Sequence, residues 1–342
     1  MNLEQTTVKN TFAPTETWRL DEALEEPVQQ ALHVMNQKDP AALIQGLKDE
    51  VEEAPNGAKL AILRGENPEE YSDTDALVMF NPFGNAATPN MLVRAEFVRE
   101  VAQAADVRDE QGKFKPVIML ASPGVNGSSL SLDKEGRNQI KNGDLGPVAR
   151  EMLQAVTERD FGRIALLGFS QGADMALAGA RTAYGTNLDT HALAIGDPAG
   201  VEDRGMVRLG LDFMKAPDIK PSVEATGLEA QKVALGKGVK DMANFAASAV
   251  RSDNRLLIRG MGKDTFEDSM QEILENDAVD KLVVGYGGES AIAKPEVIEP
   301  ALQNLHIGHK QNDLISVKVH GADHTWGDQL TLLSKLYMRA VA

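Results

Sequence analysis

The segment RIALLGFSQGADMALAGA, residues 163–180, decides the fold of this chain. It opens with a short apolar run, continues through Gly-Phe-Ser-Gln-Gly, and passes at once into an alanine-rich stretch. The apolar run predicts a buried strand, and the small residues Ala173, Ala176 and Ala180 predict a helix with one face that lies close on a sheet. The chain therefore turns directly from strand to helix at Ser170.

The same alternation recurs along the chain. Apolar runs separated by stretches of helical spacing begin the segments 58–65, 75–85, 115–129, 162–172, 190–200, 280–290 and 314–328. Short buried strands that alternate with helices are typical of parallel sheets covered on both faces. We therefore predict an α/β fold with a mostly parallel central sheet and helices on both of its faces.

Two segments depart from this alternation. Residues 1–57 are acidic and contain two amphipathic patterns, so we expect a helical N-terminal segment that packs on the core. Residues 200–265 are helix-prone and punctuated by glycine, which predicts a helical lid inserted into the core of residues 58–199 and 266–342.

The predicted lid carries four large apolar side chains. Two interpretations are open: they line an apolar substrate channel, or they pack the lid onto the body. The four are Met206, Phe213, Met214 and Phe245.

The composition excludes several classes of protein. The 342 residues are 42% hydrophobic and 25% charged, which is ordinary for a soluble globular protein, and no apolar run approaches the ~20 residues of a membrane span. The net charge of −16 argues against nucleic-acid binding through a basic surface. The absence of cysteine excludes disulfides, thiolate metal sites and a cysteine nucleophile, and it suits a cytoplasmic protein.

The glycines around Ser170 indicate what the turn can do. A direct strand-to-helix turn forces the serine into an unfavourable backbone conformation, and Gly168 and Gly172 leave room for the close approach of the two elements. The hydroxyl would then stand at the carboxyl edge of the sheet, where open α/β folds bind ligands. The N–H of Gln171, at the start of the helix, is placed to donate to an oxyanion. The alternative is a glycine-lined loop with a structural serine.

A nucleophilic serine needs a base, usually histidine. The chain has six: His33, His191, His306, His309, His320 and His324. His324 lies in the loop after the late strand LISVKV, at the same edge of the sheet as Ser170, so it is our choice; His320, at the end of that strand, is the second.

These motifs together resemble those of the α/β-hydrolase family. GFSQG is similar to the nucleophile turn of that family's carboxylesterases, thioesterases and cutinases, and GADHTW (321–326) is similar to its histidine loop. SPGVNGSS (122–129) resembles a further loop of many members. NPFGN (81–85) stands where the family has its oxyanion loop, which implies a second oxyanion donor at the N–H of Phe83.

The resemblance implies an acid after the strand KLVVGYGG (281–288). The usual spacing puts it at Ser290, which has no carboxylate. We therefore choose Glu289, one residue earlier. Asp197, after the strand HALAIG, is the second candidate, and a missing or different acid is the third possibility. Asp323, beside His324, is interpreted as a loop residue.

The predicted function is that of a serine hydrolase. Ser170, His324 and Glu289 would cleave a small-molecule carboxylic ester or thioester through an acyl-enzyme, with Gln171 and Phe83 as oxyanion donors and with no cofactor or metal. The alternative from another class is a catalytically silent hydrolase-fold module that binds a ligand or a partner protein. A peptidase of the same fold is a third hypothesis.

Overall fold

The computed structural model describes residues 13–82, 88–123, 132–205, 208–209, 212, 219–235, 252–308 and 314–341. These residues form one nine-stranded sheet with the order β1-β9-β8-β7-β6-β4-β5-β3-β2. The strands are β1 (Glu16–Arg19), β2 (Val51–Glu53), β3 (Lys59–Leu63), β4 (Asp75–Phe80), β5 (Val117–Leu120), β6 (Arg163–Phe169), β7 (Asp189–Gly196), β8 (Lys281–Gly287) and β9 (Leu314–His320). In this order across the sheet, every neighbouring pair from β1 through β9 and β4 to β5 is parallel. At the other edge, β3 is antiparallel to both β5 and β2.

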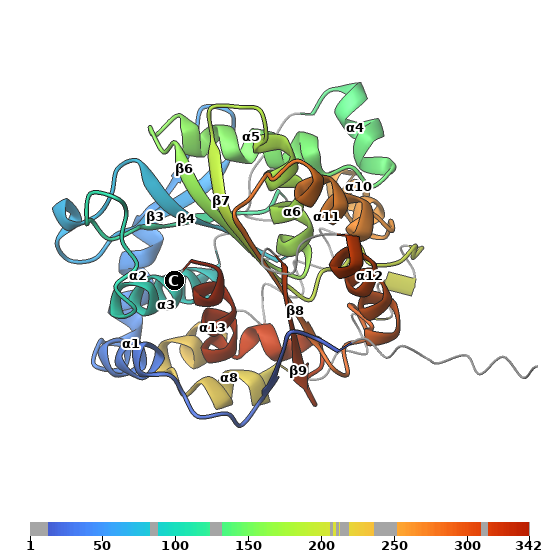
Figure 1. The fold of residues 1–342 in the computed structure, drawn as a ribbon. Coiled ribbons are helices and arrows are strands. Elements are labelled where there is room, and N and C mark those ends of the chain that lie inside the picture. Colours follow the sequence, from blue (N-terminus) through green and yellow to red (C-terminus); the bar gives the residue numbers. More distant parts are fainter. Residues whose placement is uncertain are drawn as a thin grey trace, which may run out of the picture.

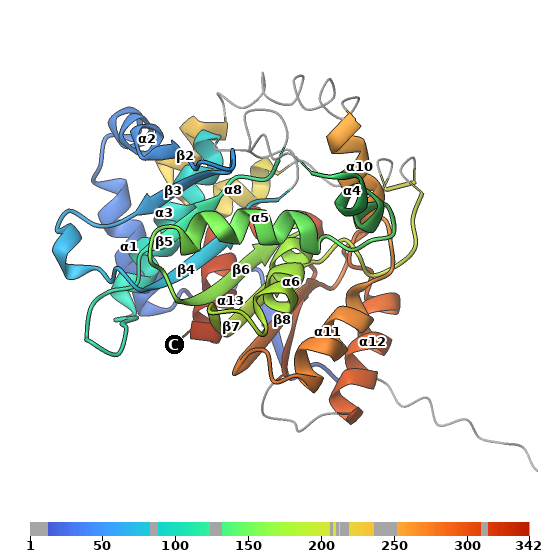
Figure 2. The ribbon, with the colours of Figure 1, turned by 90° about the horizontal axis from the view of Figure 1, so that it is seen from above.

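Helices cover both faces of the sheet (Figure 1). One face carries α1 (Glu26–Asn36), α2 (Pro40–Asp49), α3 (Pro89–Ala104), α8 (Lys220–Thr226) and α13 (Leu330–Val341). The other carries α4 (Lys134–Lys141), α5 (Gly146–Thr157), α6 (Gln171–Ala183), α10 (Ser252–Met261), α11 (Phe266–Glu275) and α12 (Pro295–Gly308). Figure 2 shows α5 and α6 side by side on this second face. The predicted fold class, a mostly parallel sheet with helices on both faces, is confirmed.

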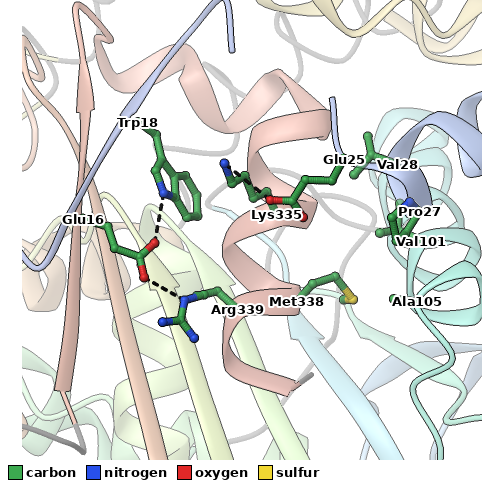
Figure 3. Close-up of a pocket in the computed structure, with 10 residues that line it drawn as sticks. All are labelled: Glu16, Trp18, Glu25, Pro27, Val28, Val101, Ala105, Lys335, Met338 and Arg339. Carbon is green, nitrogen blue, oxygen red and sulfur yellow. Dashed lines mark hydrogen bonds and ion pairs between the residues drawn. The ribbon is translucent and has the colours of Figure 1, made fainter. Parts of the chain in front are cut away.

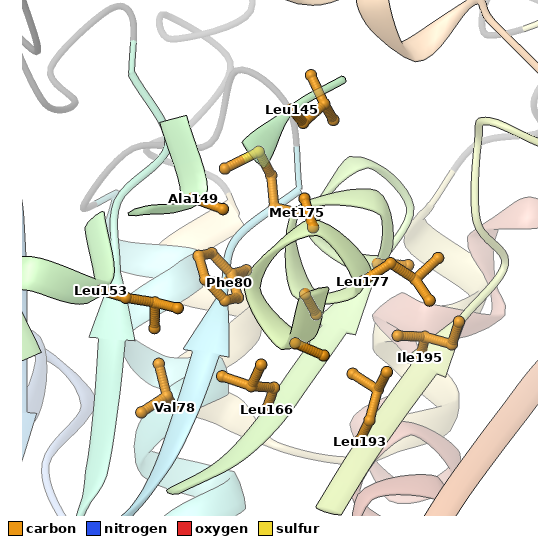
Figure 4. Packing of buried hydrophobic residues seen from close by; sticks show 14 of the residues in the cluster. Val78, Phe80, Leu145, Ala149, Leu153, Leu166, Met175, Leu177, Leu193 and Ile195 are labelled. Carbon is orange, nitrogen blue, oxygen red and sulfur yellow. The ribbon is translucent and has the colours of Figure 1, made fainter. Parts of the chain in front are cut away.

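The central strands are buried on both sides, as their continuous apolar runs require. In β4, Val78 and Phe80 belong to the core beneath α5 and α6, while Leu77 and Met79 belong to the core beneath α3 and α13. Figure 4 shows the first of these layers, in which side chains of β4, β6 and β7 lie opposite those of α5 and α6. The period of two along each strand therefore divides its side chains between two separate cores.

The N-terminal segment contains more than the expected helices. Helices α1 and α2 are present, but residues 16–19 also add the parallel edge strand β1 next to β9, and residues 51–53 add β2 at the opposite edge. In β1 the side chain of Trp18 is buried, while Glu16 is partly buried and Thr17 is exposed. Four residues with one buried side chain give too short a pattern for a strand to be recognised.

Much of the predicted lid, including Met206, Phe213, Met214 and Phe245, lies outside the described residues. The described parts include α8 and α10. Helix α8 packs on the segment His324–Asp328, a 3-10 helix that we label η2, and α10 packs on α4. Within the described ranges, no helix combines the length and the apolar character needed to cross a bilayer.

Helix α6 lies unusually close to the sheet. A Cβ added to Gly168 would lie 2.1 Å from the carbonyl oxygen of Gly172, and one added to Gly172 would lie 2.2 Å from the carbonyl oxygen of Phe80. Both contacts are with backbone, which cannot move away as a flexible side chain can. The two glycines are therefore required by the packing of β6, α6 and β4.

This packing predicts opposite effects for two glycine substitutions. Gly172→Ala should lower the free energy of unfolding by about 1–3 kcal/mol or more, because the new methyl group overlaps backbone. Gly46→Ala is the control, since that exposed helical glycine has open space around it and should gain ~0.5–1 kcal/mol. Urea denaturation of both variants tests this. Equal stabilities would contradict the packing described here.

Candidate active site

Ser170 stands at the junction of β6 and α6, in a strained backbone conformation. Its φ is 57° and its ψ is −128°, a region that non-glycine residues rarely occupy. The N–H of Ser170 donates to the carbonyl of Gly196 at 2.8 Å, which ties the turn to the end of the neighbouring strand β7. The conformation that the glycine spacing predicted is thus present, and the turn lies at the carboxyl edge of the parallel strands.

His324 lies against this serine. Its Nε2 is 3.0 Å from Ser170 Oγ, although the two residues are 154 positions apart in the chain. His324 begins η2, which follows β9, and its ring packs on Phe169 with the ring centroids 5.3 Å apart. The second candidate, His320, is exposed at the end of β9. The structure thus brings together Ser170 and His324, the pair selected from the sequence.

The carboxylate at His324 is that of Asp197, and this corrects the choice of Glu289. Asp197 Oδ2 is 2.5 Å from His324 Nδ1, and Asp197 is fully buried. Glu289 is exposed, and in the described structure no hydrogen bond or ion pair joins its carboxylate to His324. The physical reason is local. Ser290 is buried and directed at Asp197, so the side chain of its neighbour Glu289 projects outward, while the Glu289 N–H donates to the carbonyl of Ala322.

Asp197 is held by several donors besides His324. The N–H of Gly287 donates to Oδ1 at 2.8 Å, the hydroxyl of Ser290 donates to Oδ2 at 2.5 Å, and the indole N–H of Trp326 lies 3.4 Å from Oδ1. Asp197 itself has a φ of 49°, a conformation that aspartate adopts more readily than most residues. A buried carboxylate is stable only when its oxygens are hydrogen-bonded in this way.

Sequence reasoning did not assign roles to Ser290, Trp326 or Phe169. Ser290 was noted only as the residue that replaces an expected acid. Phe169 precedes Ser170, and its ring meets that of Trp326 edge-on, with the centroids 5.1 Å apart. A signal for both aromatic residues lies in nearby glycines, because a Cβ at Gly196 would collide with Phe169 and press on Trp326.

Of the two predicted oxyanion donors, one lies within the described residues and the other does not. Gln171 is the first residue of α6, where backbone N–H groups have no acceptor within the helix. Phe83 lies outside the described residues, as does most of the segment 122–129. Among the residues described, the side-chain amides of Gln171 and Asn81 are buried without a hydrogen-bond partner. Asn81 follows β4 and abuts the turn, since a Cβ at Gly172 would lie 3.1 Å from its carbonyl carbon.

A second buried carboxylate, Asp174, connects α6 to the loop that carries Asp197. Its two oxygens accept from the N–H groups of Gly200 at 3.1 Å and Ala199 at 3.3 Å. Burial raises the pKa of Asp174 to about 7, and this effect outweighs the two backbone hydrogen bonds and the charge of Arg204, which lower it. Arg204 also donates to the carbonyl of Ile292 and so joins the loops that follow β7 and β8.

The segment 219–235 of the predicted lid contacts η2 and the start of α13 directly. Ser222 Oγ and Thr325 Oγ1 are 3.1 Å apart, and Gln231 Nε2 donates to the carbonyl of Asp328 at 2.9 Å. Thr226 Oγ1 accepts from the N–H of Leu330 at 2.9 Å. These bonds attach the segment to both ends of η2.

A groove of about 420 Å³ lies elsewhere, between β1, α1, α3 and α13 (Figure 3). Its floor includes Trp18 and Val28, and its charged rim is paired, with Arg339 on Glu16 at 2.8 Å and Lys335 near Glu25 at 3.5 Å. Neither Ser170 nor His324 lines it, so it is separate from the site described above.

No protein-family model and no curated protein sequence matches the chain. Among solved structures it is similar to a carboxylesterase of Nitrososphaera gargenis (11% identity, 84% of this chain and 95% of that one, TM-score 0.49). It is also similar to a thermophilic esterase of Thermogutta terrifontis (15%, 85% and 96%, 0.45) and to 2-hydroxy-6-oxo-6-phenylhexa-2,4-dienoate hydrolase of Rhodococcus sp. strain RHA1 (12%, 84% and 98%, 0.46).

The chain has the α/β-hydrolase fold. Its own topology carries this conclusion: a mostly parallel sheet with antiparallel β3, a strained serine turn after a central strand, and a histidine loop after a late one. At these identities and TM-scores, the likeness to solved structures assigns neither residues nor a reaction to the chain.

Asp174 makes the stability of the protein depend on pH. Because its pKa in the folded protein is about 7 and that of an unfolded aspartate is about 4, the folded state binds the proton more tightly. This contribution is fully present below about pH 4 and is lost as the pH rises to about 7.

The free energy of unfolding of the wild type, minus that of Asp174→Asn, should therefore fall across this range by up to ~1.4 kcal/mol per pH unit. Urea denaturation at several pH values measures the difference, and all other titrating groups cancel from it. A difference that is constant between pH 4 and 7 would contradict the assignment.

Proposed function

We propose that the protein is a serine hydrolase that cleaves carboxylic esters or thioesters through Ser170, His324 and Asp197. The single observation that carries the proposal is the chain of contacts from Ser170 Oγ to His324 Nε2 at 3.0 Å and from His324 Nδ1 to Asp197 Oδ2 at 2.5 Å. The base thus lies within hydrogen-bond reach of both the nucleophile and the orienting acid, which is the arrangement that acyl transfer to a serine requires.

The first step is acylation. Ser170 Oγ attacks the carbonyl carbon while His324 Nε2 takes the hydroxyl proton, and Asp197 holds the imidazolium that forms. The N–H of Gln171 donates to the oxyanion, with the amino end of α6 behind it. Collapse of the tetrahedral intermediate breaks the bond to the alcohol or thiol, which leaves with the proton from His324.

The second step is hydrolysis of the acyl-enzyme. His324 takes a proton from water, the hydroxide attacks the acyl carbonyl, and the proton returns to Ser170 as the acid product leaves. The N–H of Phe83 stays a predicted second oxyanion donor. We also propose that residues 200–265 form a lid, an assignment supported by the bonds between its described segment 219–235 and η2.

A fluorophosphonate probe tests for the activated serine. The wild type should be labelled at Ser170, and Ser170→Ala and His324→Ala should lose the label, because one lacks the nucleophile and the other the base. Intact-mass spectrometry and peptide mapping locate the adduct. If the folded wild type is not labelled at pH 8, the proposal fails and a binding role takes its place.

The acid is tested by a matched pair of variants. Asp197→Asn should lower kcat for a p-nitrophenyl ester by roughly 10⁴-fold, the effect of the corresponding change in a serine protease. Glu289→Gln should leave kcat within about twofold, because that side chain is exposed and makes no bond to His324. The reverse ranking of the two variants would return the acid to Glu289.

A further inference from the structure

Ser290 contacts the same carboxylate of Asp197 as His324 does. Its Oγ is 2.5 Å from Asp197 Oδ2, the same oxygen that lies 2.5 Å from His324 Nδ1. We propose that Ser290 is a positioning residue of the triad, which sets the orientation of the Asp197 carboxylate. The inference rests on the proposed function and concerns a residue that touches no reacting atom.

The hydrogen-bond directions around Ser290 are determined. The N–H groups of Ile292 and Ala293 both donate to its Oγ at 3.1 Å. A hydroxyl oxygen has two acceptor lone pairs and one hydrogen, so two incoming donors leave only the hydrogen for Asp197. Ser290 therefore donates to Oδ2, in one fixed direction, and it cannot turn to accept from another group.

Two donors on different oxygens prevent rotation of the carboxylate. Ser290 holds Oδ2 and the N–H of Gly287 holds Oδ1 at 2.8 Å. Without the hydroxyl, the carboxylate is anchored mainly through Oδ1, and among the described residues Oδ2 keeps only its bond to the imidazole that it has to orient. Ser290 is 3% exposed, so water does not readily replace the missing donor.

The first experiment is Ser290→Ala in steady-state ester hydrolysis. We expect kcat to fall about 10- to 100-fold, the range for loss of a hydrogen bond to a charged group, with KM within about twofold because Ser290 does not contact the substrate. The acidic limb of the kcat/KM profile should move to lower pH, because a carboxylate whose Oδ2 is less well directed at the imidazole stabilises the imidazolium less. Ser269→Ala, at a buried serine of α11, is the matched control and should change neither kcat nor the pH profile.

The second experiment keeps or removes the hydroxyl at constant size. Ser290→Thr should keep kcat within about fivefold of the wild type, because its hydroxyl can still donate to Asp197 Oδ2. Ser290→Val, equal in shape but without the hydroxyl, should lose about 10- to 100-fold. Equal rates for these two variants would overturn the positioning role, and this comparison holds even if Ser290→Ala alone does not fold.

A measurement without substrate separates this inference from the proposed function. The proton on His324 Nδ1 should give a far-downfield ¹H resonance, which is assigned by its loss in His324→Ala and should shift in Ser290→Ala but not in Ser269→Ala. An unshifted resonance together with unchanged kcat and pH profile would overturn the positioning role. If the resonance shifts in Ser290→Ala but the wild type takes up no fluorophosphonate, the positioning role stands and only the proposed reaction is contradicted.

Discussion

The buried carboxylate of Asp197 is the constraint around which the carboxyl edge of the sheet is organised. Burying a charge is costly unless its oxygens are hydrogen-bonded, and here the donors come from two other loops. Gly287 and Ser290 approach from the end of β8, and His324 and Trp326 approach from η2 after β9. One side chain thus holds three loops in register, because each must be in place for the carboxylate to be satisfied.

The position of Ser170 relative to this carboxylate follows from the sheet. Strands β6, β7, β8 and β9 are consecutive neighbours and run parallel, so their carboxyl ends form one edge. Ser170 follows β6 and Asp197 follows β7, and the bond from the Ser170 N–H to the Gly196 carbonyl joins the two turns. Because backbone of Gly172 meets backbone of Phe80, α6 has no freedom to shift, and the strained conformation of Ser170 is retained.

Much of the fold was predictable because its signals are local. The strands β3 to β9 are continuous apolar runs bounded by turn residues, and burial on both faces makes such runs distinct. The edge strands β1 and β2 were not predicted, since each is short and mostly solvated. β1 also depends on pairing with β9, and Thr15 next to it bonds Ser316 across 301 positions of sequence, a contact that no local pattern contains.

The sequence by itself determined the alternation of strands and helices, the serine turn and the histidine loop, because glycine spacing and the end of an apolar run act within a few residues. Only the tertiary structure decided which carboxylate meets His324. Glu289 and Ser290 are neighbours whose side chains project to different sides, and Asp197 reaches the imidazole from 127 positions away. That choice depends on the order of β7 and β8 in the sheet and on the rotation of one turn, and neither of these is a property of a short segment.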